Sequence, residues 1–197
     1  SEFFPKSYKA ACGPLSTHSF VSQAIMSKHV KNNNIKVLIG GDGADELFGG
    51  YEFYKTFKNK FNSYPKKNPS AYSGFINNSE ISFNGWSSNN LENRINEVWS
   101  EHSNYYYFEN DYFERMIQTV LYSDTIIQLE SVGIRAADTM SMLNSVESRS
   151  FFLNHDIIEF ALNLPASFKI DLFNNHSIMQ TKPLLKELYK RKFGENL

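Results

Sequence analysis

The stretch IKVLIGGDGADELFGG at residues 35–50 constrains the fold of this chain most. Its β-branched run at 35–39 is flanked by turn-forming residues, which predicts a strand buried on both faces, as in a parallel sheet. A glycine turn follows at once, and apolar residues at helical spacing come after it. Strand, glycine turn and helix in this order predict a parallel α/β unit.

Three acids, Asp42, Asp45 and Glu46, follow the predicted strand end, where open α/β sheets bind their ligands. On a helical turn, the Cβ atoms of Asp42 and Asp45 would lie about 5–6 Å apart. Two such charges repel by roughly 3 kcal/mol when partly buried, which exceeds the ~0.3–1 kcal/mol that each gains from a helix dipole. Either the acids face water, with Asp42 as a helix cap, or a cation such as Mg²⁺ lies between them.

Helical spacing of apolar residues recurs along the rest of the chain. We expect Ser16 or Thr17 to cap the first of the resulting helices and Thr181 the last, which a glycine ends. Gly49 and Gly50 interrupt the second helix, which predicts close packing or a bend there. The spacing predicts helices at 16–31, 47–61, 112–148 (two or three helices), 155–164 and 182–193.

The amino-acid composition indicates which partners and which cellular compartment to expect for this chain. Residues 62–104 are rich in Asn, Ser, Pro and Gly, which predicts an irregular, surface-exposed insertion. The net charge of -1 gives no field for nucleic acid or an anionic membrane, and no apolar run reaches the roughly 20 residues that span a bilayer. A single cysteine, Cys12, fits a reducing cytoplasm. We expect a cytoplasmic protein without nucleic-acid or membrane partners.

Three motifs point to a known family. GGDGADELFGGY resembles the asparagine synthetase signature SG(D/E)G(S/A/G)DE(L/V)FGGY, and AADTMSMLNSVESRSFFLNHDIIEFALNLP resembles the pattern DRxSMxxSxExRxPFLDHxLxEFxxxLP of the same family. KPLLKELYKRKFG resembles the helix that follows in that family. The resemblance implies an α/β fold of the adenine nucleotide alpha-hydrolase-like type with a parallel sheet, of which this chain would hold mostly helices and one or two short strands.

The resemblance also implies a reaction. In this family, an ATP-pyrophosphatase domain adenylates a carboxylate with ATP and Mg²⁺, and ammonia that a glutaminase domain releases from glutamine converts the acyl-adenylate to an amide. Aspartate is the default acceptor, which gives asparagine, AMP and pyrophosphate. Two alternatives stay open: another acceptor, such as a surface-polysaccharide sugar precursor, or a non-catalytic remnant.

Site residues follow from the same resemblance. By position, Asp45 is similar to the magnesium ligand, and Asp42 and Glu147 are similar to acidic residues beside the reacting carboxyl group. Two carboxylates in one pocket would raise the pKa of one of them, which suits a group that takes the proton of an incoming amine.

Four further residues are expected on the nucleotide side. Gly40, Gly41 and Gly43 would let the backbone approach the cofactor closely, and Arg149 would contact it. An alternative for Arg149 is a simple ion pair with Glu147 that ties two helices together.

The chain also departs from the family pattern. Gly40, Thr139, Phe151 and Asn154 replace the usual hydroxyl residue, arginine, proline and aspartate, and the SGG-x-DS pyrophosphate loop, the glutaminase domain and the K-x-GF lysine do not occur in the sequence. We therefore expect residues 1–197 to be one partial domain, the C-terminal part of a synthetase domain, which is inactive alone. A homodimer is left open as an assembly state.

Overall fold

The computed structural model describes residues 2–13, 17–51, 54, 97, 100–101, 112–171 and 181–194. Nearly all of the predicted insertion at 62–104 lies outside these residues. The chain divides into two compact units: the first unit holds Ser1–Ala44 and Asp124–Ala161, and the second unit holds Asp45–Ser123 and Leu162–Leu197. The elements are α1 (Phe3–Ala11), α2 (Ser19–Asn32), β1 (Val37–Gly40), α3 (Ala44–Phe48), α7 (Tyr112–Ser123), the π-helix η2 (Asp124–Ile134), α8 (Arg135–Met142), β2 (Glu147–Ser150), the 3₁₀ turn η3 (Phe151–Leu153), α9 (His155–Asn163), α10 (Ala166–Lys169) and α11 (Pro183–Phe193).

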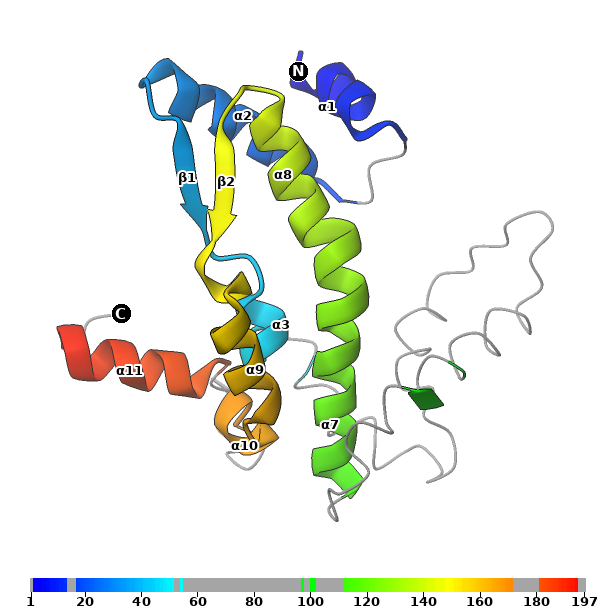
Figure 1. Cartoon of the computed structure of the whole chain (residues 1–197), viewed down its shortest axis with the longest axis vertical. Coiled ribbons are helices and arrows are strands. Elements are labelled where there is room, and N and C mark those ends of the chain that lie inside the picture. Colours follow the sequence, from blue (N-terminus) through cyan, green and yellow to red (C-terminus); the bar gives the residue numbers. More distant parts are fainter. Residues whose placement is uncertain are drawn as a thin grey trace. The chain divides into compact units, whose positions relative to one another are not determined.

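A two-stranded parallel sheet organises the first unit (Figure 1). β1 and β2 pair in a register that sets Val37 opposite Glu147 and Gly40 opposite Ser150. The expected combination of mostly helices with one or two short strands is confirmed. A parallel pair needs a long crossover connection, and here the chain between the two strands supplies it.

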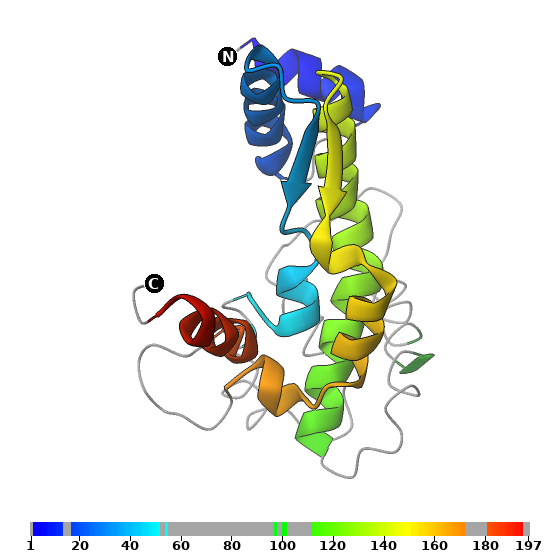
Figure 2. The same cartoon turned by 60° about the vertical axis from the view of Figure 1, so that its left-hand side comes forward.

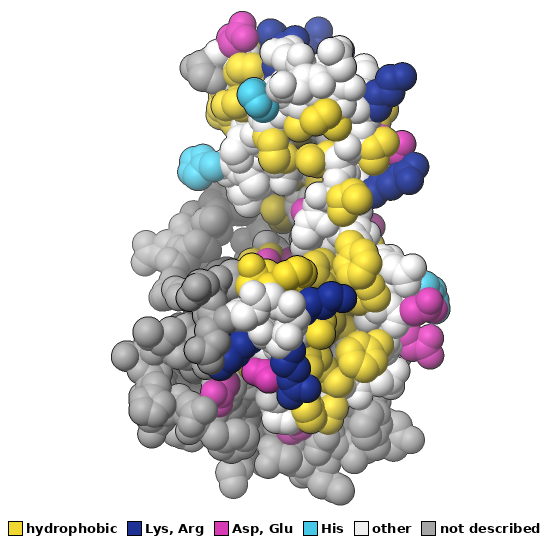
Figure 3. All heavy atoms as spheres, turned by 90° about the vertical axis from the view of Figure 1, so that its left-hand side faces the viewer, with side chains coloured by type: hydrophobic (Ala, Val, Ile, Leu, Met, Phe, Trp, Pro, Cys, Tyr) yellow, Lys and Arg dark blue, Asp and Glu magenta, His cyan; other side chains and the backbone are white. Residues whose placement is uncertain are grey.

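One face of this sheet is open, so the prediction of a strand buried on both faces is wrong for the described structure. Val37 is 40% exposed and Ile39 is 74% exposed. Residues of α2 and α8 lie across the face that carries Leu38 and Ser148, and no described element covers the other face. Hydrophobic side chains reach the protein surface in several places (Figure 3), and those of the open sheet face are among the exposed ones.

The core of the first unit lies where α1, α2 and α8 meet. Phe20 and Ala24 of α2 pack with Ala136 and Met140 of α8, and Ala11 of α1 closes the cluster. Each of these five side chains is at most 4% exposed. Alanines at the contact let the helix backbones approach closely, and this packing fixes α2 and α8 beside the sheet.

Buried hydrogen bonds reinforce the same helix pair. Ser27 Oγ donates to the carbonyl oxygen of Met140 at 2.7 Å. Asn144 Nδ2 donates to the carbonyl oxygen of Ala24 at 3.1 Å and to Ser27 Oγ at 2.8 Å. Because an unpaired buried polar group is costly, this network holds α2 and α8 in one register.

The helix predicted at 16–31 is confirmed as α2, which begins at Ser19, but its N-cap is His18 and not Ser16 or Thr17. Thr17 Oγ1 accepts a hydrogen bond from the Ser19 N–H at 3.3 Å, while Ser16 lies outside the described residues. His18 occupies the N-cap position without a side-chain hydrogen bond.

Helix covers less of 112–148 than predicted. α7, η2 and α8 follow one another without a break and give the expected two or three helices. Ser145 then adopts a φ of 57°, a left-handed conformation that turns the chain, and β2 begins at Glu147. The helical spacing of the apolar residues did not indicate this strand.

Gly49 limits the helix that was predicted at 47–61. α3 begins at Ala44 and ends at Phe48, because Gly49 has a φ of 67°. A Cβ at Gly49 would lie 2.3 Å from Ile170 Cγ1. The expected close packing at the glycines is confirmed. The predicted helix is interrupted at residues 49–51, Tyr54 is helical again, and the rest of 47–61 lies outside the described residues.

The other two helix predictions are confirmed as α9 and α11. α10 contacts both α7 and α11, and Figure 2 shows α10 beside α11. Lys182, with a φ of 54°, occupies the N-cap position of α11, so the prediction of Thr181 as the cap is wrong. Thr181 instead forms a backbone bridge with Ile170. No described helix has the length and apolar character that a bilayer crossing requires.

A buried lysine in the second unit has a hydrogen-bond partner but a lowered pKa. The Lys169 side chain is 1% exposed, and its Nζ donates to Gln118 Oε1 at 2.7 Å. Gln118 Nε2 donates in turn to the carbonyl oxygen of Leu164 at 2.7 Å. Burial lowers the pKa of Lys169 to about 7, although the Glu114 charge opposes this shift.

The lowered pKa of Lys169 should make the stability of the protein depend on pH. Since its pKa is about 7 in the folded protein and 10.5 in the reference state, the unfolded chain holds more protons between these values. The free energy of unfolding should rise on the order of a few kcal/mol from pH 7 to 9.5, as measured by urea unfolding. Lys169→Met should flatten the rise, and exposed Lys186→Met should not. An equal rise in both variants would refute this role of Lys169.

Loss of the Asn144 hydrogen bonds should also lower the stability of the protein. Asn144→Ala removes the Nδ2 donor from Ser27 Oγ and from the Ala24 carbonyl, to which Ser27 Oγ still donates. The free energy of unfolding should therefore fall by about 1–3 kcal/mol. Exposed Asn32→Ala at the end of α2 is the matched control and should change it by less than about 0.5 kcal/mol. Similar urea midpoints for the two variants would contradict the proposed network.

Candidate active site

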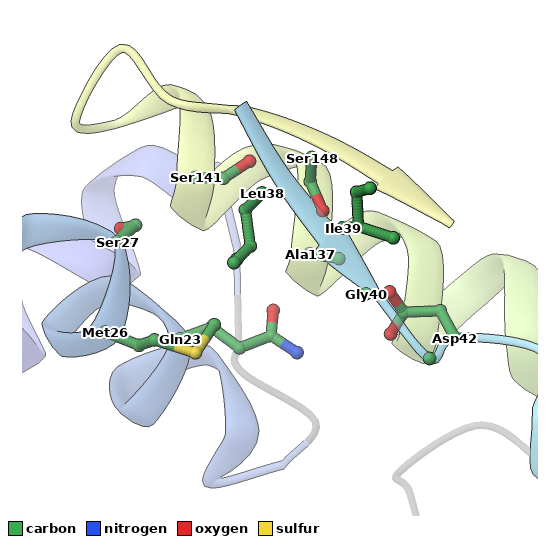
Figure 4. Close-up of a pocket in the computed structure, with 11 residues that line it drawn as sticks. Gln23, Met26, Ser27, Leu38, Ile39, Gly40, Asp42, Ala137, Ser141 and Ser148 are labelled. Atoms are coloured by element: carbon green, nitrogen blue, oxygen red, sulfur yellow. The ribbon is translucent and has the colours of Figure 1, made fainter. Parts of the chain in front are cut away.

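A cavity of about 260 Å³ lies within the first unit, at the carboxyl end of β1 (Figure 4). Two helices and both strands form its walls, and the glycine turn after β1 forms its end. Among the residues that line it, only Asp42 carries a charge. The lining residues are Gln23, Met26 and Ser27 of α2, Leu38, Ile39, Gly40, Gly41 and Asp42 of β1 and its turn, Ala137 and Ser141 of α8, and Ser148 of β2.

Asp42 is held at the cavity by its neighbours. Its carboxylate folds back over Gly40, where an added Cβ would lie 2.7 Å from Asp42 Oδ2. Ser150 Oγ donates to the carbonyl oxygen of Asp42, which ties the turn to β2. Burial raises the pKa of the Asp42 carboxyl group, and a backbone hydrogen bond opposes this shift in part. Gly40 therefore makes room for the carboxylate.

The three predicted nucleotide-side glycines have different surroundings. Gly40 and Gly41 line the cavity, and no atom lies within 4 Å of a Cβ built at Gly41. Gly43 has a φ of 92°, and a Cβ there would lie 2.9 Å from Leu153 Cδ2. The packing of the turn thus requires a glycine at position 43, whereas the backbone at position 41 is open to a ligand.

Gln23 is a cavity residue that sequence reasoning missed. Its Oε1 is buried and accepts no hydrogen bond from a described residue. Figure 4 shows the side-chain amide extending into the cavity on the side of Gly40 and Asp42. A glutamine inside an amphipathic helix gives no signal in the sequence, because only the fold shows which face it occupies.

Glu147 and Arg149 lie away from this cavity. Arg149 Nε donates to Glu147 Oε1 at 2.7 Å, and both side chains are more than half exposed. Glu147 stands opposite Val37 at the start of the strand pair, whereas Asp42 follows the end of β1. The ion pair that was considered as an alternative is present, but it joins two residues of β2 instead of two helices. Their catalytic and nucleotide-binding roles stay predictions.

Asp45 belongs to the second unit, where its carboxylate already has a cationic partner. Lys182 Nζ lies 2.8 Å from Asp45 Oδ1, and a Cβ at Gly50 would lie 1.8 Å from the same oxygen. No group of three or more His, Cys, Asp or Glu side chains in the described part of the chain is placed to hold a metal. Mg²⁺ in nucleotide sites takes as few as one carboxylate, so Asp45 fits such an ion when Lys182 releases it.

The chain belongs to the asparagine synthase family, because the profile of that family matches residues 2–194. The chain is 28% identical over 204 residues to Asparagine synthetase [glutamine-hydrolyzing] 2 of Bacillus subtilis strain 168, which covers 94% of this chain and 25% of the relative. It is 22% identical over 235 residues to Amidase chyE of Penicillium rubens, which covers 90% of this chain and 33% of that protein.

These matches show how much of its relatives the chain covers. It spans only a quarter to a third of the length of the two curated relatives. No solved structure matches the chain significantly. The family and the mostly helical α/β fragment expected from the motifs are thus confirmed.

Gly40 offers a direct test of the Asp42 geometry. Gly40→Ala should push the carboxylate out of the cavity into water, so the Asp42 pKa should fall toward 3.8, as followed by carboxyl ¹³C NMR. Gly41→Ala is the matched control, because its Cβ meets nothing within 4 Å, and it should leave this pKa unchanged. An unaltered pKa in Gly40→Ala would exclude the described carboxylate position.

The Lys182–Asp45 pair predicts the behaviour of a metal in the second unit. Lys182→Met frees the Asp45 carboxylate, so Mn²⁺, used as a paramagnetic substitute for Mg²⁺, should broaden the NMR signals around Asp45 at several-fold lower concentration. Asp45→Asn should abolish this broadening, and exposed Lys190→Met should not alter it. Broadening that persists in Asp45→Asn would show that this carboxylate is not the ligand.

Proposed function

We propose that this chain forms the acidic side of the synthetase site in an ATP-dependent amidotransferase that converts aspartate to asparagine. The family match over residues 2–194 supports this proposal, together with the position of Asp42 at the carboxyl end of a parallel strand. In α/β sheets this edge is where ligands bind. The cavity places that carboxylate and the open backbone of Gly41 beside the same space.

The proposed reaction has two steps. A carboxylate oxygen of the acceptor forms a bond to the α-phosphorus of ATP, and pyrophosphate leaves. Ammonia then forms a C–N bond to the acyl carbon, the bond to the AMP oxygen breaks, and the nitrogen loses a proton. Asp42 is suited to receive that proton, since burial raises the pKa of its carboxyl group and a base works best when its pKa lies near the working pH.

The other predicted site residues take supporting roles in this proposal. Asp45 would hold Mg²⁺ after Lys182 releases it, and the ion would neutralise charge on the phosphate oxygens. Gly40 and Gly41 would admit the nucleotide to the strand end. Glu147 and Arg149 lie on the open sheet face, so they would reach the nucleotide only from that side.

Further parts of the enzyme would lie outside this chain. Because the chain covers a quarter to a third of its relatives, we propose that a pyrophosphate-binding loop and a glutaminase domain complete the site in the full-length protein. We also propose that this protein is cytoplasmic. An acceptor other than aspartate is the second candidate, and Phe151 and Asn154 support it because they depart from the family pattern.

The reaction can be tested in the protein expressed with its flanking coding sequence. Aspartate-dependent exchange of pyrophosphate into ATP measures adenylation, and asparagine formation measures the amide step. Asp42→Asn should lower the amide step about 10²–10⁴-fold. Gln128→Met on η2, outside the cavity, is the control and should retain full activity.

Three results would contradict the proposal. Exchange that depends on another carboxylate but not on aspartate would show that this carboxylate is the acceptor. Full asparagine formation in Asp42→Asn would remove Asp42 from the chemistry. The 197-residue chain alone should show no exchange, and clear exchange by that chain would refute its assignment as a partial site.

A further inference from the structure

Helix α11 is anchored to the second unit through its first turn. Thr181, just before the helix, forms a backbone bridge with Ile170, and α11 contacts α10. From there the helix runs away from α10 (Figure 1). Residues 183–185 are half-buried, whereas every residue from 186 to 193 is exposed. The second half of α11 therefore presents its side chains to a partner.

Large apolar side chains gather on this exposed half. Leu188 is 59% exposed, Tyr189 is 39% exposed and Phe193 is 71% exposed. The rings of Tyr189 and Phe193 contact each other, with their centroids 4.9 Å apart. Association with a partner would remove this apolar surface from water, which favours binding.

Two lysines lie on the side of the helix that carries these apolar residues. Lys186 lies three residues before Tyr189 and seven before Phe193, a spacing that places side chains along one stripe of a helix. Lys192 lies four residues after Leu188 and three after Tyr189, so it stands between them. We call Lys186, Leu188, Tyr189, Lys192 and Phe193 the basic-aromatic face of α11.

The helix dipole does not account for this pattern of charge. Cations near the carboxyl end of a helix complement the dipole, and this effect covers Lys192. It does not cover Lys186, which follows the first turn of α11, a turn without acids. Glu187 pairs with a different cation, since Arg191 Nε lies 2.8 Å from Glu187 Oε1. The two lysines of the face thus favour a partner that supplies carboxylates.

The mixing of lysine with apolar residues distinguishes a protein partner from a membrane. A helix that lies on a membrane keeps its cations on the polar side, apart from its apolar side. On α11, Lys192 stands within the apolar side, where a lipid surface would bury its ammonium group at a cost. A protein helix can place a carboxylate opposite that ammonium group and still pack apolar residues against the two rings.

We propose that the basic-aromatic face of α11 binds an acidic amphipathic helix of a partner protein. Apolar residues of that helix pack against Leu188, Tyr189 and Phe193. Its carboxylates pair with Lys186 and Lys192, which flank the two rings. This inference is independent of the proposed reaction, because α11 belongs to the second unit and the cavity beside Asp42 belongs to the first.

A synthetic peptide tests this proposal on the ¹⁵N-labelled 197-residue chain. The peptide has about 14 residues, which form about four helical turns, with leucine along one side and glutamate elsewhere. A second peptide carries lysine in place of each glutamate. At constant ionic strength, the glutamate peptide should give saturable shifts of the backbone amides of residues 186–193. The lysine peptide should bind roughly 10-fold more weakly or not at all.

A charge swap isolates the contribution of the lysines. Lys186→Glu combined with Lys192→Glu should weaken binding of the glutamate peptide roughly 10-fold and should let the lysine peptide bind instead. Because this variant gains a new affinity, a loss of folding cannot imitate the expected result. Exposed Lys28→Glu combined with Lys31→Glu on α2 is the matched control. It changes the net charge equally and should leave binding of both peptides unchanged.

A second pair of substitutions isolates the apolar contacts. Leu188→Ser combined with Phe193→Ser keeps both lysines and removes two of the three large apolar side chains, so the glutamate peptide should no longer give saturable shifts. Exposed Phe4→Ser on α1 is the control and should not change binding. The result for Leu188→Ser and Phe193→Ser decides the question if the charge-swapped variant fails to fold.

Several outcomes would overturn the inference. Equal binding of the two peptides, unchanged binding in the charge-swapped variant, or absence of shifts with the glutamate peptide would each exclude the proposed partner. Shifts with vesicles of phosphatidylglycerol and phosphatidylcholine but not with the peptide would assign the face to a membrane. Shifts that grow with protein concentration alone would assign it to a second copy of the chain. Binding is measured without ATP or aspartate, so asparagine synthesis is tested separately.

Discussion

The parallel pairing of β1 with β2 is the interaction on which the site depends. Its register places Gly40 opposite Ser150, and this brings the turn after β1 to the end of β2 and the side of α8. Ser150 then holds the Asp42 backbone. The α2–α8 core supplies the remaining wall. Because side chains alternate along a strand, Leu38 and Ser148 share the face that α2 and α8 cover, whereas Val37 lies on the exposed face.

A second physical effect, desolvation, gives the site its chemistry. The sequence suggested that repulsion between Asp42 and Asp45 would dominate, yet the two carboxylates have separate surroundings. Asp42 is half-buried beside an apolar cavity, which raises the pKa of its carboxyl group. Asp45 is paired with Lys182. The two acids therefore differ in their surroundings: one borders an apolar cavity and the other forms an ion pair.

The limits of the sequence prediction have clear physical causes. Residue patterns located α2, α9 and α11, because apolar spacing and stop residues act locally. They missed β2, since its residues at 147–150 carry no apolar alternation and the strand depends on pairing with β1. They placed Asp42 correctly at a strand end but could not find Gln23, whose place beside the cavity depends on tertiary packing. The position of Gly49 as a helix end follows from contact with Ile170, which lies far along the chain.

The strand register is the most direct test of this account. Interstrand nuclear Overhauser effects in the labelled protein should pair Leu38 with Ser148 and Gly40 with Ser150. A register shift of one residue reverses the face of every side chain in a strand. Effects that pair Leu38 with Glu147 or Arg149 would turn Ser148 away from the cavity and contradict the site described for Asp42.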